Sequence, residues 1–426
     1  MASTQPARGM RDFLPADVRK RDYVIGVIKS VYESYGFEPL ETPAVENIDT
    51  LMGKYGEEGN QLIFKILKRG EKLRQETADG RQEIIESELS DLALRYDLTV
   101  PLARVVANNR NDLPKFFKRY QIQPVWRADR PARGRFREFY QCDVDSIGST
   151  SMVVEAEIIS AAIAILEKLR FDDFSVRINH RQLLSKMVAD AGIGNETDAL
   201  VALDKLDKIG AEGVKKDLLG RGIDNASANK FLAAVTGDVS NEELDRVIQL
   251  CGSSRVKIDP SLARGLSYYT GTIMEINVPD LAGSLGGGGR YDGLIGMFGK
   301  DQIPACGFSL GLERILVVMD ERGMFPPEIA ESAPADVLVT IWSDETAADS
   351  LKLAQELRSA GSRVTLYPEP DKLGKQIKYA DSIKVPFVCV LGESEIADGT
   401  VTIKNMRTGE QQTIARGDAA TAIKNG

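Results

Sequence analysis

The hydrophobic pattern of the first fifty residues predicts one helix followed by extended chain. Apolar residues recur every three or four positions between Tyr23 and Tyr35, and Gly36 follows directly. That spacing is typical of an amphipathic helix, and a glycine just beyond such a run is a common stop. Residues 37–46 contain two prolines and predict an extended segment.

The next hundred residues predict a pair of strands and a buried helix. Residues 70–90 are polar and rich in glutamate, and they predict a hairpin or a mobile loop. Between residues 118 and 147, short aromatic and β-branched segments surround a loop near Pro131 and Gly134, which predicts two antiparallel strands. Residues 153–169 are apolar on most sides and predict a largely buried helix.

After Phe171 the pattern changes. Residues 183–250 are rich in lysine, aspartate and alanine with helical periodicity, which predicts an inserted helical subdomain. Strand-like segments return between residues 256 and 310, and we expect the glycine-rich run 283–289 to interrupt them. Residues 312–321 predict another helix.

A linker precedes a differently organised C-terminal region. Pro326, Pro327 and Pro334 mark the linker. From residue 337 to residue 391 the pattern alternates strand, helix, strand, helix, strand, and two shorter strands are expected at 400–405 and 411–414. Such alternation predicts a small, mostly parallel sheet with helices on it. The whole pattern is α+β: a mostly antiparallel core with a helical insertion and an α/β tail.

Length and composition are those of a globular protein with two or three domains. The chain has 426 residues, 43% of them hydrophobic and 27% charged. No apolar run reaches the roughly 18 residues of a membrane span. Four widely separated cysteines suggest a reducing cytoplasm and exclude a zinc site built from thiolates. With His180 as the only histidine, zinc held by several imidazoles is excluded as well.

The charge distribution leaves a nucleic-acid partner possible despite a net charge of −9. Residues 115–137 contain eight basic side chains and one acid, Asp129. A solvated surface is the ordinary interpretation of such a run. The alternative is a local positive face that binds phosphates, which the net charge does not exclude.

The context of this basic run favours a nucleotide site. Residues 126–130 read WRADR and residues 134–141 read GRFREFYQ. One guanidinium group can bind two phosphate oxygens at once, and an aromatic face can stack on a base. The order resembles motif 2 of class II aminoacyl-tRNA synthetases. The resemblance implies that Arg127 binds the α-phosphate, Arg135 the outer phosphates and Phe139 the adenine, with Asp129 where relatives usually carry an adenine-facing glutamate.

Two further segments resemble the remaining class II motifs. Residues 307–315, GFSLGLERI, predict a strand that passes through glycine into a helix with Arg314 in its first turn. A cation is disfavoured at a helix start, which points to an anionic or aromatic target nearby. The segment resembles motif 3, which implies that Arg314 contacts ATP. Residues 40–43, LETP, resemble motif 1, which implies a homodimer.

Two signatures narrow the resemblance to histidyl-tRNA synthetases. Residues 262–271 read LARGLSYYTG and residues 287–294 read GGGRYDGL. The resemblance implies that Arg264 is the main catalytic residue, opposite Arg127 at the α-phosphate, where fixed cations stabilise developing negative charge. It further implies an imidazole pocket, lined by Tyr268, Tyr269 and Tyr291. Ser267 stands where most relatives carry an aspartate.

The histidine ligand needs polar partners as well, because an imidazole presents two nitrogens. Residues 95–99, RYDLT, resemble the segment that binds the amino group of the substrate, which implies roles for Asp97 and Thr99. Residues 141–145, QCDVD, resemble the segment that contributes Gln141 and an acid, here Asp145. Many relatives have glutamate at the positions of Asp97 and Asp145.

Two features have simpler alternatives. The glycine run could be a flexible linker, but its place between strands favours close approach of the backbone to a ligand. A catalytic His180 is conceivable, but a packed or capping residue at the entry to the insertion is the better interpretation.

Taken along its length, the resemblance implies a class II-type antiparallel sheet core with flanking helices formed by residues 1–180 and 251–325, a helical insertion over 181–250 and an anticodon-binding-type α/β domain over 334–426. It implies ATP-dependent activation of L-histidine and transfer to tRNA(His), with Mg²⁺ shielding the phosphates; Asp129 and Glu313 are guesses for its ligands. A non-catalytic regulatory subunit, a tRNA-sensing module and a sister synthetase for proline or threonine are the alternatives.

Overall fold

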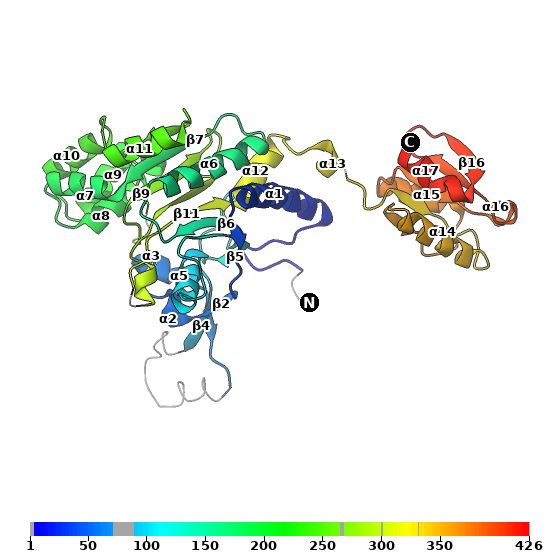
Figure 1. The fold of residues 1–426 in the computed structure, drawn as a ribbon, viewed down its shortest axis with the longest axis horizontal. Helices are drawn as coiled ribbons and strands as arrows, with labels where there is room; N and C mark the ends of the chain where they lie inside the picture. Colours follow the sequence, from blue (N-terminus) through cyan, green and yellow to red (C-terminus); the bar gives the residue numbers. More distant parts are fainter. Residues whose placement is uncertain (1–3, 71–88, 265–267, 300, 331, 426) are drawn as a thin grey trace. The chain divides into compact units, whose positions relative to one another are not determined.

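The computed structural model describes residues 4–70, 89–264, 268–299, 301–330 and 332–425. The chain divides into two compact units, Met1–Phe325 and Pro326–Gly426 (Figure 1). Each unit has its own hydrophobic core. Within the described residues, no helix is both long and apolar enough to cross a bilayer.

An eight-stranded sheet organises the first unit. Its order is β1-β5-β6-β11-β10-β9-β7-β8, and all pairings are antiparallel except β1 with β5 and β7 with β8. In that order the strands are Glu38–Pro39, Phe117–Trp126, Glu138–Ile147, Ala305–Gly311, Gly286–Arg290, Thr272–Asn277, Ser175–His180 and Val256–Ile258. The expected antiparallel core is confirmed.

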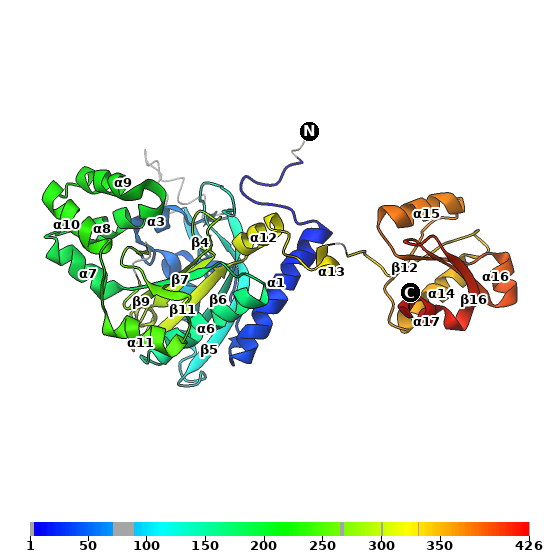
Figure 2. The same cartoon turned by 90° about the horizontal axis from the view of Figure 1, so that it is seen from above.

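Three long helices pack together on this sheet. They are α1 (Pro15–Ser34), α6 (Val153–Lys168) and α12 (Leu312–Glu321), and they pack as one layer over β6 and β11 (Figure 2). Helix α1 buries a stripe at helical spacing that includes Val24, Ile28 and Val31. The three predicted helices are confirmed, and the opposite face of the sheet is left for polar side chains.

A smaller sheet lies beside the main one. Its order is β2-β4-β3, with strands Val45–Asn47, Ser90–Leu94 and Lys65–Leu67. Helices α2 (Ile48–Leu51), α3 (Gly56–Gln61) and α5 (Thr99–Asn108) belong to the same region. Most of the predicted hairpin or loop over 70–90 falls on residues 71–88, which lie outside the described residues.

Five helices form the region between β7 and β8. They are α7 (Arg181–Asp190), α8 (Glu196–Leu203), α9 (Leu206–Gly220), α10 (Asn225–Val235) and α11 (Glu242–Cys251). Several begin at a side chain that accepts a backbone N–H, which is the usual capping device. His180 is such a cap for α7: its Nδ1 accepts the Gln182 N–H at 3.3 Å. The capping interpretation of His180 is confirmed.

The glycine run differs from the prediction. Gly286–Arg290 is itself strand β10, near the middle of the sheet, so the expected interruption is wrong. Glycine is required here because the neighbouring strands leave no room for a Cβ. A Cβ on Gly288 would lie 2.0 Å from the Gly307 carbonyl oxygen. Glycine has a low β-propensity, so the sequence pattern did not predict a strand here. Packing against the neighbouring strands imposes the extended conformation.

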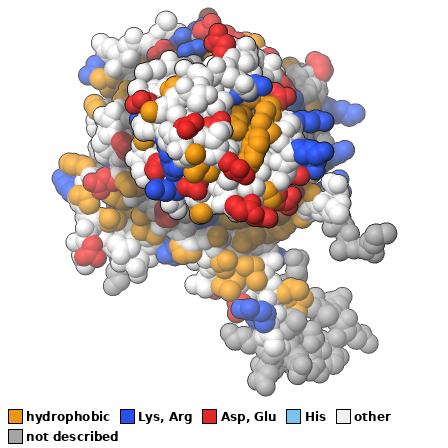
Figure 3. Space-filling view, turned by 90° about the vertical axis from the view of Figure 1, so that its right-hand side faces the viewer, with side chains coloured by type: hydrophobic (Ala, Val, Ile, Leu, Met, Phe, Trp, Pro, Cys, Tyr) orange, Lys and Arg blue, Asp and Glu red, His pale blue; other side chains and the backbone are white. Residues whose placement is uncertain are grey.

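The second unit contains a five-stranded sheet of order β13-β12-β14-β15-β16. Its elements after the short α13 (Pro327–Ala330) are β12 (Val337–Val339), α14 (Ala347–Ser359), β13 (Val364–Leu366), α15 (Leu373–Ser382), β14 (Phe387–Val390), α16 (Glu393–Asp398), β15 (Thr400–Asn405), β16 (Gln411–Ala415) and α17 (Ala419–Asn425). Figure 3 shows acidic, basic and hydrophobic side chains intermixed on the surface.

This sheet is mixed, whereas the sequence predicted a mostly parallel one. Strand β12 pairs in parallel with β13 and β14, but β14 with β15 and β15 with β16 are antiparallel. The physical reason is the length of the connections. Residues 391–399 and 406–410 are shorter than the dozen or so residues that a parallel crossover needs.

Candidate active site

Three adjacent strands present a grid of polar side chains on one face of the main sheet. Strand β6 contributes Gln141, Asp143 and Asp145 at alternate positions, so all three side chains share a face. In the β5 register, Gln123, Gln121 and Arg119 lie opposite these three residues. In the β11 register, Gly311, Ser309 and Gly307 do so. Polar β5 and β6 positions thus border small β11 positions, which leaves space above the sheet.

That space is a cavity of about 380 Å³. Every candidate site residue predicted from the sequence lines it: Asp97, Thr99, Arg127, Asp129, Arg135, Phe139, Gln141, Asp145, Arg264, Tyr268, Tyr269, Tyr291 and Arg314. These residues come from five separate stretches of the chain, and the fold brings them together. Ser267 lies outside the described residues.

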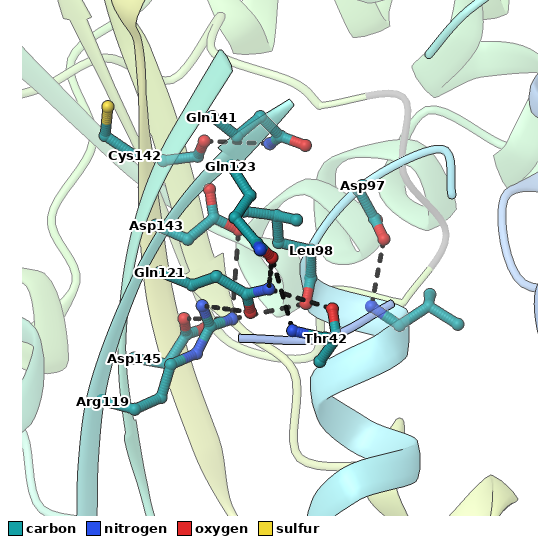
Figure 4. Close-up of polar contacts among 12 residues, drawn as sticks. Thr42, Asp97, Leu98, Arg119, Gln121, Gln123, Gln141, Cys142, Asp143 and Asp145 are labelled. Carbon is teal, nitrogen blue, oxygen red and sulfur yellow. Dashed lines mark hydrogen bonds and ion pairs between the residues drawn. The ribbon is translucent and has the colours of Figure 1, made fainter. Parts of the chain in front are cut away.

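One end of the cavity carries carboxylates and tyrosines. The Tyr291 hydroxyl donates a hydrogen bond to Asp145 Oδ1. Arg119 Nη2 lies 2.8 Å from Asp145 Oδ2 (Figure 4). Asp97 Oδ1 accepts the Tyr55 hydroxyl and the backbone N–H of Val100, both at 3.0 Å. This end therefore combines negative charge with aromatic surface, as a cationic or N–H-rich ring requires.

The rings of this end also contact one another. Tyr268 lies 4.9 Å from Tyr269 and 6.1 Å from Tyr291 between ring centroids. The second contact is edge-on, an arrangement that aromatic pairs favour. Thr99 lines the cavity as the first residue of α5. The tyrosines therefore form a preassembled aromatic wall.

The other end carries arginines. Arg127 Nε donates to the Tyr96 carbonyl oxygen at 3.0 Å, and its guanidinium lies 5.2 Å from the centroid of the Phe139 ring. Arg135 Nη2 forms an ion pair with Asp129 Oδ1 at 2.7 Å. The carbonyl contact fixes Arg127 without neutralising its charge.

Two more arginines reach the cavity, Arg264 from the segment after β8 and Arg314 from α12. Arg264 Nη1 lies 3.3 Å from Glu275 Oε2. Arg314 Nη1 donates to the Ser284 carbonyl oxygen. Burial and the nearby Arg135 lower the pKa of Arg314, which records how much positive charge is gathered here. Such a cluster suits a polyphosphate.

Glycines make room for these side chains. A Cβ on Gly287 would lie 1.8 Å from Arg264 Nη1, and a Cβ on Gly307 would lie 1.9 Å from Asp145 Oδ1. Both glycines belong to strands that form the floor of the cavity. Gly287 of the glycine-rich signature therefore determines where Arg264 can lie, and Gly307 of the segment 307–315 does the same for Asp145.

Burial shifts the acids of the cavity towards protonation. It raises the pKa of Asp97 and of Asp145, and it raises the pKa of Asp143 to about 7. Burial also raises the pKa of Glu313 to about 7, although both its oxygens accept the Tyr140 N–H, at 3.1 and 3.0 Å. A ligand that brings positive charge is therefore favoured at the acidic end.

The residues that the sequence did not single out include Tyr55, Arg119, Asp143 and Glu275. Asp143 lies between two predicted residues on one strand, so alternation along β6 could have identified it. Arg119 could have been found only through the β5–β6 register. No sequence pattern could have identified Tyr55 or Glu275, because their contacts come from tertiary packing.

Among the described residues, no group of three or more His, Cys, Asp or Glu side chains could hold a metal ion. The two guesses from the sequence, Asp129 and Glu313, line the cavity, but each already has a partner in Arg135 or the Tyr140 N–H. A metal here would need ligands from a substrate.

Comparisons with known proteins find relatives that match nearly the whole chain. The histidyl-tRNA synthetase profile matches residues 9–315, and the anticodon-binding domain profile matches residues 336–426. Histidine–tRNA ligases from Porphyromonas gingivalis and Christiangramia forsetii are 42% and 41% identical to this chain, with 98% of each chain covered. The crystal structure of histidyl-tRNA synthetase from Nostoc sp. PCC 7120 superimposes with a TM-score of 0.77 at 32% identity, with both chains fully covered.

Proposed function

Because the chain belongs to the histidyl-tRNA synthetase family and is an aminoacyl-tRNA ligase that activates histidine and charges tRNA, we propose that histidine and ATP react in the cavity above β6, β11 and β10. The observation that carries this proposal is that one cavity is lined both by four arginines, Arg127, Arg135, Arg264 and Arg314, and by buried carboxylates and tyrosines. ATP matches the arginines in charge. Histidine matches the carboxylates and tyrosines in charge and shape.

At the arginine end, Arg127 and Arg264 bind the α-phosphate. A carboxylate oxygen of histidine attacks the α-phosphorus, the bond to the bridging oxygen breaks, and pyrophosphate leaves with that electron pair. Negative charge builds up on the phosphate oxygens during this step, and fixed guanidinium groups stabilise it without reorganisation. Arg264 Nε has no hydrogen-bond partner among the described residues, which supports a role for a ligand there.

The remaining ATP contacts follow from the same end of the cavity. Arg135 and Arg314 bind the outer phosphates, and Phe139 stacks on the adenine while Asp129 faces it. Burial and neighbouring cations lower the pKa of Arg314, and a bound polyphosphate offsets the repulsion from those cations. Arg135 leaves Asp129 or shares it when ATP arrives, because the two form an ion pair in this structure.

At the acidic end, Asp97, Thr99 and Gln141 bind the α-ammonium group. Asp97 Oδ2 and Gln141 Oε1 are buried and have no hydrogen-bond partner among the described residues. Unpartnered buried acceptors are costly unless a ligand satisfies them. Asp145, Tyr268, Tyr269 and Tyr291 form the imidazole pocket, closed by the aromatic wall described above.

Mg²⁺ fits this site only as an ion held mainly by phosphate oxygens and water. Magnesium is commonly bound in nucleotide sites by one or two carboxylates together with the phosphates. Asp129 and Glu313 are the acids at the ATP end that could serve. When bound, the ion would neutralise part of the phosphate charge.

The remaining parts of the proposal concern the whole chain. Residues 1–180 and 251–325 form the catalytic core, 181–250 a helical insertion, and 334–426 the domain that contacts the anticodon region. After activation, a hydroxyl of the terminal adenosine of tRNA(His) attacks the carbonyl carbon and releases AMP. The enzyme works as a homodimer in the cytoplasm, where its cysteines remain thiols.

ATP–pyrophosphate exchange tests the catalytic proposal. Purified protein is assayed with histidine, proline, threonine or glycine as the sole amino acid. We expect exchange with histidine alone and a loss of 100-fold or more in Arg264→Ala, about the cost of removing one oxyanion-stabilising donor. Arg322→Ala is the matched control, because Arg322 pairs with Asp173 and Asp280 outside the cavity. Full exchange by Arg264→Ala would disprove the proposed role of Arg264.

A further inference from the structure

One arginine behind the cavity joins three carboxylates. Arg177 on β7 forms ion pairs with Glu275 Oε1 at 2.6 Å and with Asp207 Oδ2 at 2.8 Å. It forms a third with Asp259 Oδ2 at 3.1 Å, and its Nε donates to Asn277 Oδ1 at 3.1 Å. Burial lowers the pKa of Arg177, but its hydrogen bonds to Asp207 and Glu275 outweigh burial and raise it. All three nitrogens of this guanidinium therefore have protein partners.

Glu275 connects Arg177 to Arg264. It lies on β9 and lines the cavity. Arg177 binds its Oε1, and its Oε2 lies 3.3 Å from Arg264 Nη1. A carboxylate that is held at one oxygen presents the other oxygen in one place, which is how a neighbouring hydrogen bond locks the rotamer of a functional side chain. Arg177 therefore fixes the direction from which Glu275 holds the Arg264 guanidinium.

Asp259 connects Arg177 to the backbone that leads to Arg264. Its Oδ1 accepts the Ser261 N–H at 2.9 Å and the Ser261 hydroxyl at 2.6 Å, while Oδ2 binds Arg177. The Leu262 N–H closes the turn by donating to the Asp259 carbonyl oxygen at 3.0 Å. The turn ends two residues before Arg264. Arg177 therefore binds groups that hold both the side chain of Arg264 and the backbone before it.

Asp207 brings the helical insertion into this set of ion pairs. It lies in the first turn of α9, and it pairs with Arg177 Nη2, the nitrogen that also binds Glu275. Asp204 and Lys208, close to it along the chain, line the cavity. Because two carboxylates share one nitrogen, a change at Asp207 alters how firmly Arg177 holds Glu275. The start of α9 is therefore linked to Arg264 through two successive ion pairs.

We propose that Arg177 is a positioning residue for histidyl-adenylate formation, which fixes Arg264 through Glu275 and Asp259, and that Asp207 couples the helical insertion to it. The inference rests on the proposed function, in which Arg264 is catalytic. Arg177 does not line the cavity, so it acts by placing the guanidinium that stabilises charge at the α-phosphate. The alternative is that these ion pairs only join β7 to its neighbours and stabilise the fold.

Pyrophosphate exchange by Arg177→Gln and Arg177→Lys tests the role of Arg177. We expect Arg177→Gln to lower kcat about 10- to 100-fold, while the KM values for histidine and ATP stay within about threefold. Arg177→Lys should recover part of the loss, because an ammonium group keeps the charge but lacks the planar fork. Arg221→Gln is the matched control, since Arg221 pairs with Asp198 and Asp217 inside the insertion. An unchanged kcat in both Arg177 variants would overturn the inference.

A double-mutant cycle separates positioning from a general contribution to the fold. If Arg177 acts through Arg264, Arg177→Gln should change exchange by less than about twofold when Arg264 is already alanine. A loss by the same factor in both backgrounds would mean that Arg177 serves the fold as a whole, and the inference would be wrong. The single variant Arg264→Ala tests the proposed function separately. If it loses exchange while Arg177→Gln does not, the role of Arg264 stands and only the role of Arg177 fails.

Asp207→Asn tests the link to the insertion without removing a buried charge. The Asp207 side chain is 58% exposed and Arg177 keeps its other two carboxylates, so we expect the Tm to change by no more than about 2 °C. The kcat of exchange should still fall about 2- to 10-fold. Asp217→Asn on the same helix is the matched control, because Asp217 pairs only with side chains of the insertion among the ion pairs of the described residues. Equal kcat values for Asp207→Asn and the unsubstituted chain would show that the insertion is not coupled to Arg264.

Discussion

The two units of the chain use charged residues in opposite ways. In the described part of the first unit, the buried polar residues include ten acids and arginines: Glu46, Arg95, Asp97, Arg119, Asp129, Asp143, Asp145, Glu155, Arg290 and Glu313. In the described part of the second unit, the buried polar residues are Thr340, Thr346, Ser350, Ser362 and Gln376, all of them uncharged. The second unit keeps its charges at the surface.

Half of these buried charges line the candidate active site, namely Asp97, Asp129, Asp143, Asp145 and Glu313. A buried charge costs several kcal/mol of desolvation, so it is retained where a ligand or reaction needs a fixed charge in a dry place. Exposed charges cost little and act on a large polyanion through the summed field. Substitution of a charged residue should therefore have a large effect in the first unit and a small effect in the second.

The largest expected effect is on folding, for Arg119→Leu. Arg119 is fully buried between Asp143 and Asp145, so its loss leaves buried negative charge without a cation. We expect a loss of about 3–5 kcal/mol in the free energy of unfolding. The matched variant in the second unit is Arg363→Leu, whose half-exposed ion pair with Asp336 should be worth about 1 kcal/mol or less. Denaturant unfolding measures the loss in free energy of unfolding for both variants. Equal losses would show that the two units do not differ in their dependence on charged side chains.

The pH dependence of stability should differ in sign between the units. Burial raises the pKa of Glu313 from 4.5 to about 7. Its contribution to stability is therefore complete below pH 4.5 and is lost as the pH rises to about 7, a change on the order of 3 kcal/mol. In the second unit, hydrogen bonds from Lys375 and Tyr367 lower the pKa of Asp371. That contribution is present above pH 3.8 and is lost on further acidification.

Thermal unfolding of Glu313→Gln and Asp371→Asn as a function of pH measures these opposite slopes. Relative to the unsubstituted chain, Glu313→Gln should gain stability as the pH rises from 4.5 to 7. Asp371→Asn should show no such gain in that range. Parallel curves for the two variants would show that burial of Glu313 does not control its protonation.

The next largest effect is catalytic, for Gly287→Ala. The added methyl would occupy the position of the Arg264 guanidinium, which is the end of a flexible side chain and can move. A displacement of an ångström or more should reduce pyrophosphate exchange about 100-fold while the fold persists. Gly374→Ala on α15 is the matched control, because nothing lies within 4 Å of its added Cβ. Full activity in Gly287→Ala would mean that the position of Arg264 is not critical.

The smallest expected effect is on tRNA binding, for Lys378→Gln. Lys378 is exposed on α15, a helix that also carries Lys375, with Lys372 as its N-cap and Lys384 shortly after it. Loss of one phosphate contact should lower the salt dependence of tRNA binding by roughly one ion and leave pyrophosphate exchange unchanged. Filter binding at several salt concentrations measures the slope. An unchanged slope would show that Lys378 does not contact the RNA backbone.

Much of the fold could be predicted from local pattern. The helix that became α12 was predicted with the same limits, 312–321, because its apolar spacing and the preceding Gly311 agree. Strands β5 and β6 were predicted from β-branched and aromatic segments around a turn. Strand β10 was missed, because four consecutive glycines carry no strand propensity and only their packed neighbours impose extension.

The candidate site divides in the same way. The predicted residues were found through their motifs, and all of them line one cavity. The motifs did not show which hydrogen-bond and ion-pair partners each of these side chains has in the folded chain. Which oxygens of Asp143 and Asp145 remain without a hydrogen-bond partner depends on Tyr291 and Arg119, which come from other segments of the chain. No spacing in residues 141–145 distinguishes these two aspartates.

The sequence by itself determined the residue types, their local conformations and the family of chemistry, because periodicity and motif spacing act over short stretches of chain. The tertiary structure alone decided which charges share a partner, which acceptors remain open and which glycines make room for Arg264. These properties depend on strand register and burial. Both arise from contacts between distant segments, such as Asp145 with Tyr291, and no local pattern encodes them.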